Sequence, residues 1–181
     1  MPTQIIGLVG HIGAGKGMLA SILVEKHHAE VIRFSTILRK IIQVLDLPET
    51  RDNLINASES LRKTFGEDVL SHAIASAALS SSAPMVVVDG IRRLDDISGL
   101  IERPEFKLVH VVADPKIRYD RLIHRGENSE ETSMTWEDFL RTEQRSTEVS
   151  IDEVANRADE TITNNGTREE LETYANHLLS N

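Results

Sequence analysis

The residues with the clearest chemical signature lie near the start of the chain, where residues 10–17 read Gly-His-Ile-Gly-Ala-Gly-Lys-Gly. This run, the phosphate loop, matches G-x-x-x-x-G-K and lies between a predicted strand and a predicted helix, as the pattern requires. Glycines let successive N–H groups point inward at an anion, and the helix adds the positive end of its dipole. Lys16 brings a full charge to the β- and γ-phosphates. The residues expected to bind nucleotide are Gly10, His11, Ile12, Gly13, Ala14, Gly15, Lys16, Gly17 and Met18.

One position departs from the pattern. Gly17 stands where a Ser or Thr hydroxyl normally ligates Mg²⁺, and Met18 after it offers no hydroxyl either. A metal ion must then be held by phosphates, waters and another side chain. Asp89, at the end of a later predicted strand, is the candidate ligand, acting through a water molecule; the alternative is that it caps the following loop.

Three classes of nucleotide-binding protein carry such a loop: a GTPase switch, an ATPase motor and a phosphotransferase. A GTPase would carry Asn-Lys-x-Asp to recognise guanine, and the sequence contains no such run. A motor ATPase usually places a glutamate directly after the strand aspartate to activate water, whereas Gly90 follows Asp89 here. The lack of that carboxylate favours an enzyme that transfers phosphate to a second substrate.

A cluster of arginines follows the fourth predicted strand. Arg118, Arg121 and Arg125 lie near one face of a predicted helix that begins at Pro115. Residues 126–133 are polar, and Arg141 and Arg145 follow them. We expect a mobile lid over residues 118–146, in which arginines stabilise the transferred phosphoryl group and exclude water. The expected catalytic residues are Lys16, Asp89, Arg121 and Arg125. The alternative is that these arginines are solvated and paired with nearby carboxylates.

A second set of polar residues follows two predicted strands. Ser35 and Arg39 come after the second strand, and Arg92 comes after the third, shortly beyond Asp89. Arginines at two adjacent strand ends are able to hold the phosphate of an acceptor bidentately. We expect Ser35, Arg39 and Arg92 to bind the acceptor, with surface salt bridging as the alternative. His11 is interpreted as a variable loop residue rather than a catalytic base.

Apolar strands alternate with helices along the chain, which predicts a single α/β domain over residues 1–181 with a parallel sheet of about five strands flanked by helices. Ligands in such folds bind at the carboxyl ends of the strands. Ser35, Thr135, Ser150 and Thr167 stand at positions expected to begin helices. The predicted strands are residues 4–10, 29–34, 85–88, 107–113 and 161–163, and the predicted helices are 16–27, 50–65, 67–80 and those beginning near 35, 115, 135, 150 and 167.

The composition is that of a globular protein, with 40% hydrophobic and 27% charged residues. The 20 basic and 29 acidic residues give a net charge of −9, which argues against a nucleic-acid partner but allows a small anion in a local basic cleft. Because the chain has no cysteine, disulfides and thiol catalysis are excluded. No signal peptide or membrane-spanning run is visible, so we expect a cytoplasmic protein with no membrane partner.

Several segments together resemble the P-loop nucleoside monophosphate kinases and dephospho-CoA kinase-like enzymes, and most closely a branch found in archaea and some bacteria. They are the phosphate loop, Phe-Ser-Thr-Ile-Leu-Arg at 34–39, Val-Val-Val-Asp-Gly-Ile-Arg at 86–92 and the arginine-rich run at 118–126. That branch continues with Thr-Trp-Glu-Asp-Phe, here residues 135–139, and ends with Asn-x-Gly-Thr, here residues 164–167. The resemblance covers nearly the whole chain and implies a three-layer P-loop fold.

The resemblance also implies cofactors and roles. ATP and Mg²⁺ are the implied cofactors, with the ATP phosphates in the phosphate loop. The residues implied to border the adenine are Asn164, Asn165 and Gly166. Arg39 is implied to hold an acceptor monophosphate with help from Arg92, beside a helical acceptor-binding region at about 35–83.

We therefore predict a small-molecule kinase that transfers the ATP γ-phosphoryl group to a nucleoside monophosphate. Dephospho-CoA kinases carry an acidic residue after the second strand to accept a hydroxyl proton, whereas this chain has Arg33-Phe34-Ser35 there. A phosphate acceptor is already anionic and needs no strong base. Two alternatives stay open: a dephospho-CoA kinase-like enzyme, and a nucleotide-binding regulatory protein with little turnover.

Overall fold

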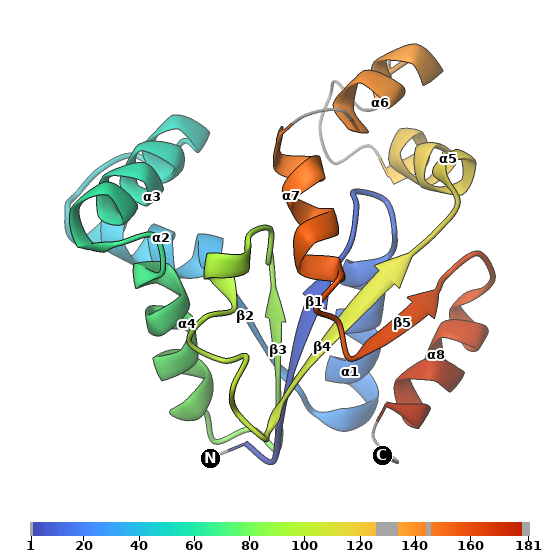
Figure 1. The fold of residues 1–181 in the computed structure, drawn as a ribbon, viewed down its shortest axis with the longest axis horizontal. Coiled ribbons are helices and arrows are strands. Elements are labelled where there is room, and N and C mark those ends of the chain that lie inside the picture. Colours follow the sequence, from blue (N-terminus) through green and yellow to red (C-terminus); the bar gives the residue numbers. More distant parts are fainter. Residues whose placement is uncertain (1, 126–133, 144–145, 179–181) are drawn as a thin grey trace.

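A computed structural model describes residues 2–125, 134–143 and 146–178, without the side chains of residues 51, 125 and 146–149. Five strands form one parallel sheet in the order β2-β3-β1-β4-β5 (Figure 1). The strands are β1 (Gln4–Val9), β2 (Glu30–Arg33), β3 (Met85–Asp89), β4 (Phe106–Val112) and β5 (Glu160–Thr163). Because every pairing is parallel, the carboxyl ends of all five strands lie along one edge of the sheet.

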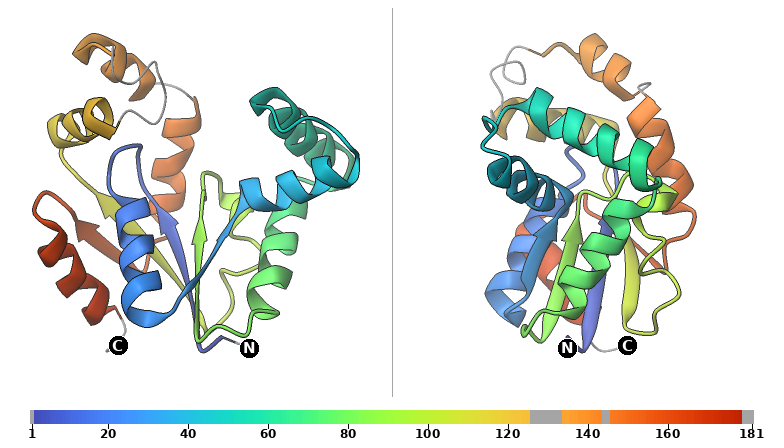
Figure 2. Two further views of the ribbon diagram at one scale, coloured as in Figure 1. Left: turned by 180° about the vertical axis from the view of Figure 1, so that it is seen from behind. Right: turned by 90° about the vertical axis from the view of Figure 1, so that its left-hand side faces the viewer.

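Helices cover both faces of the sheet because alternate strand residues point to opposite sides. Ile6 and Leu8 of β1 pack in one apolar cluster with α1 (Lys16–His27) and α8 (Arg168–His177). Ile5 and Val9 pack in the other cluster, with α4 (Val69–Leu79), α7 (Ser146–Ala155) and Ile97, which directly follows the short 3₁₀ helix η1 (Leu94–Asp96). The two sides can be compared in Figure 2. The result is a three-layer α/β structure, as predicted.

Two helical arms stand above the carboxyl edge of the strands (Figure 1). One arm is α2 (Phe34–Val44) with α3 (Arg51–Phe65), which directly follows β2. The other is α5 (Pro115–Arg125) with α6 (Trp136–Glu143), which follows β4. The phosphate loop lies between the two arms at the end of β1. The cavity beside this loop is lined in part by Arg121 and Leu122 of the α5–α6 arm.

Most predicted boundaries agree with the structure, but two helix starts were wrong. Helix α2 begins at Phe34 with Arg33 in the N-cap position, so Ser35 does not cap it. The ring of Phe34 packs in the core, which brings the first turn one residue earlier. Ser150 lies inside α7, which begins at Ser146. A Ser three residues before a Glu also occurs within helices, so this spacing alone does not fix a start.

Other local signals are confirmed. Thr167 and Glu170 form a reciprocal capping box at the start of α8, and Gly66 ends α3. Asp138 N–H donates to Thr135 Oγ1 at the start of α6. In the described ranges, no helix is long and apolar enough to cross a membrane.

Candidate functional site

The phosphate loop is shaped by three glycines with positive φ, each against a neighbour that would obstruct a side chain. A Cβ at Gly10 would lie 2.2 Å from the Val111 carbonyl oxygen on β4, with φ at +147°. A Cβ at Gly15 would lie 2.0 Å from Asn164 Nδ2, after β5. The loop curve is therefore fixed by close approach to the β4 backbone at Gly10 and to the Asn164 side chain at Gly15. Gly15 is the N-cap of α1 and supplies no capping side chain, so the helix N-terminus is presented to the loop.

Lys16 is the first residue of α1, and its side chain turns back over the loop. Its Nζ donates to the Gly10 carbonyl at 2.5 Å and to the His11 carbonyl at 3.1 Å. The ammonium group is thereby held where the loop curves. An arriving phosphate meets this positive charge together with the loop N–H groups.

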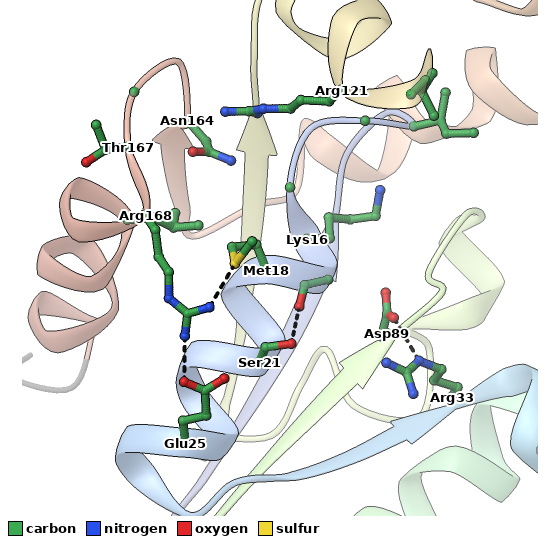
Figure 3. A pocket seen from close by; sticks show the side chains of 17 residues that line it. Lys16, Met18, Ser21, Glu25, Arg33, Asp89, Arg121, Asn164, Thr167 and Arg168 are labelled. Carbon is green, nitrogen blue, oxygen red and sulfur yellow. Dashed lines mark hydrogen bonds and ion pairs between the residues drawn. The ribbon is translucent and has the colours of Figure 1, made fainter. Parts of the chain in front are cut away.

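A cavity of about 980 Å³, the larger cavity, opens beside the loop. Figure 3 shows its side chains, with Asn164, Thr167 and Arg168 on one side and Asp89 with Arg33 on the other. Among the described residues that line it, the cations are Lys16, Arg33, Arg121 and Arg168, and the carboxylates are Glu25 and Asp89. A protein with a net charge of −9 thus has a basic cleft at the phosphate loop.

The loop after β5 closes one side of the larger cavity. Asn164 is buried, and its Nδ2 donates to the Ala14 carbonyl at 2.8 Å, which fastens this loop to the phosphate loop. Gly166 lines the cavity, as do Thr167 and Arg168. Asn165 lies elsewhere: its Oδ1 accepts from the Asp114 backbone N–H, and it is not part of the cavity wall.

Arg168 was not singled out from the sequence, although it directly follows the predicted capping residue. Its Nη2 lies 2.5 Å from Glu25 Oε2, and its Nη1 lies 3.4 Å from Met18 Sδ. Both contacts are drawn in Figure 3. The guanidinium group and Met18 together form part of the cavity wall beside α1.

The arginines of α5 have different environments. Arg118 is buried; both of its terminal nitrogens contact the Glu143 carboxylate of α6, and its Nε donates to the Ala113 carbonyl at 3.0 Å. Arg121, one turn later, lines the larger cavity, and burial lowers the pKa of its guanidinium from the ordinary value. Arg118 is therefore a structural ion pair, while Arg121 faces the site. The Arg125 side chain, residues 126–133 and Arg145 lie outside the described residues.

A smaller cavity of about 440 Å³ lies under the α2–α3 arm. Ser35 and Arg92 line it, as expected, and Arg33, Arg62 and Arg93 line it as well. Arg39 does not: its Nε lies 2.5 Å from Glu49 Oε1, and its Nη1 donates to Ser35 Oγ at 3.2 Å. Arg39, which was predicted to bind the acceptor, therefore contacts the cavity-lining Ser35 but does not line the cavity itself.

A buried ion pair supports the smaller cavity. Arg62 of α3 contacts Asp96 of η1 at 2.7 Å, and both side chains are almost fully buried. The other Asp96 oxygen accepts from the backbone N–H groups of Arg92 and Arg93. This pair was missed because its members lie 34 residues apart, with no local signal linking them. It fixes the loop that carries Arg92.

Asp89 and Arg33 line both cavities. They stand opposite each other in the β2–β3 register, and Arg33 Nε donates to Asp89 Oδ2 at 3.1 Å. The sequence placed Arg33 at the end of a strand but gave no reason to assign it a role. The Asp89 carboxylate lines the larger cavity with a guanidinium group as its partner, and its predicted role toward a metal ion stays a prediction.

His11 points away from the larger cavity toward α7. Its Nε2 lies 3.0 Å from Asp152 Oδ1. His110 on β4 is close to this pair: burial first, and then the charges of His11 and Lys16, lower its pKa, while Asp152 opposes them. Within the described residues, the His110 Nε2 is buried without a hydrogen-bond partner. These groups lie behind the loop rather than among the cavity-lining residues.

Fold and site together define a P-loop kinase-like protein. The crystal structure of TT1252 from Thermus thermophilus has this fold, with a TM-score of 0.61, 17% identity and coverage of 99% of this chain and 98% of that chain. Shikimate kinase from Acinetobacter baumannii, in complex with shikimate, gives a TM-score of 0.56, 16% identity and coverage of 98% and 93%. At these identities the likeness shows the fold alone.

Sequence relatives give the family. A family model described as an AAA domain, AAA_18, matches residues 6–139. A UPF0200 protein of Hyperthermus butylicus is 30% identical over 176 residues, which cover 97% of this chain and 93% of that protein. The chain belongs to the AAA_18 domain family and, along its length, to the UPF0200 family. The predicted P-loop kinase-like class is confirmed, while the nucleoside monophosphate or dephospho-CoA kinase branch stays a prediction.

Proposed function

We propose that the protein is an ATP-dependent kinase that transfers the γ-phosphoryl group to a nucleoside monophosphate. The observation that carries the proposal is that two basic cavities share a wall, formed by Arg33 and Asp89. The phosphate loop belongs to the larger cavity, which makes it the donor side. The smaller cavity, on the other side of the shared wall, then receives the acceptor. Transfer needs two phosphates brought into line, and a shared wall provides that arrangement.

On the donor side, the loop N–H groups and Lys16 bind the β- and γ-phosphates. The base lies toward Met18 and Arg168, with Asn164 and Gly166 holding the loop beside it. Asn165 acts indirectly, by fastening that loop to the backbone at Asp114. These roles follow from the cations and N–H groups that line the larger cavity.

On the acceptor side, Arg92 and Ser35 bind the acceptor phosphate, and Arg39 joins them by exchanging Glu49 for that phosphate. An oxygen of the acceptor phosphate forms a bond to the γ-phosphorus. The bond from that phosphorus to the β–γ bridging oxygen breaks, and this oxygen leaves on ADP. The arginine-lined wall favours an anionic acceptor over a neutral hydroxyl compound.

The lid, residues 118–146, supplies Arg121 and Arg125 to the developing charge on the transferred group. Arg118 does not take part, because its bond to Glu143 instead fixes α6 on α5. The Tyr119 ring of α5 makes edge-to-face contacts with Trp136 and Phe139 of α6, which joins the two helices of this arm.

Mg²⁺ is the metal that kinases of this fold class use, but the described residues do not form a cluster that would hold it without the phosphates of a nucleotide. Position 17 has no hydroxyl, and the described residues include no group of three or more His, Cys, Asp or Glu placed to hold a metal ion. Asp89 is paired with Arg33. Its predicted role toward a metal-bound water stays a prediction.

The test is a panel of nucleoside monophosphates and dephospho-CoA, each assayed with ATP for ADP release and for the phosphorylated product. We expect one or more monophosphates to be phosphorylated. Product from dephospho-CoA alone would instead establish the dephospho-CoA kinase alternative. Tight ATP binding with no product from any acceptor would favour a nucleotide-binding regulatory protein, a reading that the missing hydroxyl at Gly17 supports.

A further inference from the structure

The structure leaves room for a side chain at position 17, where the chain has a glycine. Gly17 lies in the first turn of α1 and lines the larger cavity. A Cβ built on it meets no atom within 4 Å, and its φ is not in the left-handed region. A side chain therefore fits here. Packing does not explain the glycine, and a metal ion on the phosphates meets no hydroxyl from this residue.

The carboxylates of the larger cavity are already engaged. Glu25 is bound by Arg168 at 2.5 Å, and Asp89 is bound by Arg33 at 3.1 Å. A metal ion at either carboxylate would lie close to the positive charge of the arginine bound there. The described part of this wall therefore presents cations toward a polyphosphate, with its two acidic groups neutralised.

Arg33 carries a positive charge at the wall that the two cavities share. It lies at the end of β2 and lines the larger and the smaller cavity alike. Asp89 engages its Nε, while the other N–H groups of the guanidinium fork are donors of a kind that bind phosphate oxygens. Half of its side chain is exposed, so a ligand can reach it, whereas the Asp89 side chain is 18% exposed.

We infer that Arg33, held by Asp89, is a catalytic residue that provides the positive charge between donor and acceptor phosphates, and that the site binds a nucleoside triphosphate with little dependence on Mg²⁺. The claim about Mg²⁺ and nucleotide binding, the binding part, depends only on the phosphate loop and the residues that line the larger cavity. The catalytic part rests on the proposed function. Asp89 is then a positioning residue for the guanidinium group.

The binding part is tested by calorimetry with AMPPNP, a non-hydrolysable ATP analogue, in excess Mg²⁺ or in EDTA. We expect the wild-type Kd to change by less than about threefold between the two conditions, because on this inference the protein binds the phosphates through its cations and N–H groups rather than through the metal ion. Gly17→Ser places a hydroxyl in the open space and should make binding in Mg²⁺ about tenfold tighter than in EDTA. Gly17→Ala is the matched comparison, with the same added Cβ and no hydroxyl, and the ratio of its Kd in EDTA to its Kd in Mg²⁺ should stay below about threefold.

A wild-type protein that already binds about tenfold more weakly in EDTA overturns the inference. If Asp89→Asn then removes that difference, Asp89 serves the metal ion instead of Arg33. Thermal melts of both Gly17 variants show that they are folded before their binding is compared.

The catalytic part is tested with Arg33→Met and Arg33→Lys, using the acceptor that the panel identifies. We expect Arg33→Met to lower kcat by on the order of 10²-fold and Arg33→Lys to recover part of the loss. Arg103→Met is the matched control, since Arg103 is exposed, pairs with Glu105 and lines neither cavity. Arg33→Met should also make AMPPNP binding more dependent on Mg²⁺, a readout that needs no turnover.

The outcomes separate the two proposals. An enzyme that phosphorylates a monophosphate and keeps its rate in Arg33→Met has the proposed function but not this catalytic residue. A protein that transfers to no acceptor lacks the proposed function and the catalytic role with it. For such a protein, the AMPPNP titrations in Mg²⁺ and in EDTA still test whether nucleotide binding depends on Mg²⁺.

Discussion

The two cavities are built in different ways. The larger cavity is shaped by backbone: Gly10 and Gly15 approach β4 and the loop after β5 so closely that no side chain would fit. The smaller cavity is shaped by side chains, some of them apolar and some of them arginines in ion pairs. Arg62 with Asp96 is buried, whereas the Arg33 side chain paired with Asp89 is half-exposed and is able to exchange its partner for a ligand. On the proposed function, the donor side is therefore preformed, and part of the acceptor side is adjustable.

The largest expected effect is on the preformed side. Lys16→Ala removes the ammonium group that the loop encloses, and we expect kcat/KM to fall on the order of 10³-fold through lost stabilisation of the transferred group. Steady-state kinetics with the identified acceptor measure this. Lys63→Ala, an exposed lysine on α3, is the control. A Lys16→Ala enzyme with wild-type kinetics would remove the loop from the reaction.

The next effect concerns the ion pair under the smaller cavity. Asp96→Ala leaves the Arg62 guanidinium buried without its carboxylate and releases two backbone N–H groups. We expect the free energy of unfolding to fall by about 3 kcal/mol. Urea denaturation measures it, with the exposed neighbour Asp95→Ala as control. If both variants unfold at the same urea concentration, the smaller cavity does not depend on this pair.

Two arginines of α5, Arg118 and Arg121, are expected to differ in their effects on stability and on catalysis. Arg118→Ala breaks the paired contact with Glu143 and should lower the free energy of unfolding by about 2 kcal/mol. Arg121→Ala, one turn away, should leave stability nearly unchanged and lower kcat by about tenfold or more. Urea denaturation and kinetics on the same two proteins give the answer. The reverse pattern would exchange the structural and catalytic roles assigned to these arginines.

The smallest effect is a pH dependence behind the phosphate loop. Burial lowers the pKa of His110 below its value of 6.5 in the unfolded chain. The unfolded state therefore takes up a proton first as the pH falls below 6.5, and stability that is present above this pH is lost toward the folded-state pKa. His110→Gln should flatten the fall in Tm across that window. An unchanged slope in this variant would show that His110 stays solvated in the folded protein.

The sequence predicted the parallel α/β fold because each of its signals is local. Strand runs such as residues 85–88, helix caps such as Thr167 with Glu170 and the loop pattern lie within a few residues of one another. The predictions for Lys16, Asn164 and Gly166 placed them at one site, since carboxyl ends of parallel strands share an edge. The helix start at Ser150 was wrong because its spacing is equally at home inside a helix.

Tertiary structure alone decided which charges serve the site. Arg118 and Arg121 look alike in the sequence, and only the position of Glu143 on α6 separates the buried ion pair from the cavity residue. Arg33 became a candidate only when the β2–β3 register placed it against Asp89, 56 residues away. A sequence motif determines the local backbone conformation, because its residues are close together in the sequence. The partner of a charged side chain depends on which distant segments the fold brings together, and no local pattern encodes that.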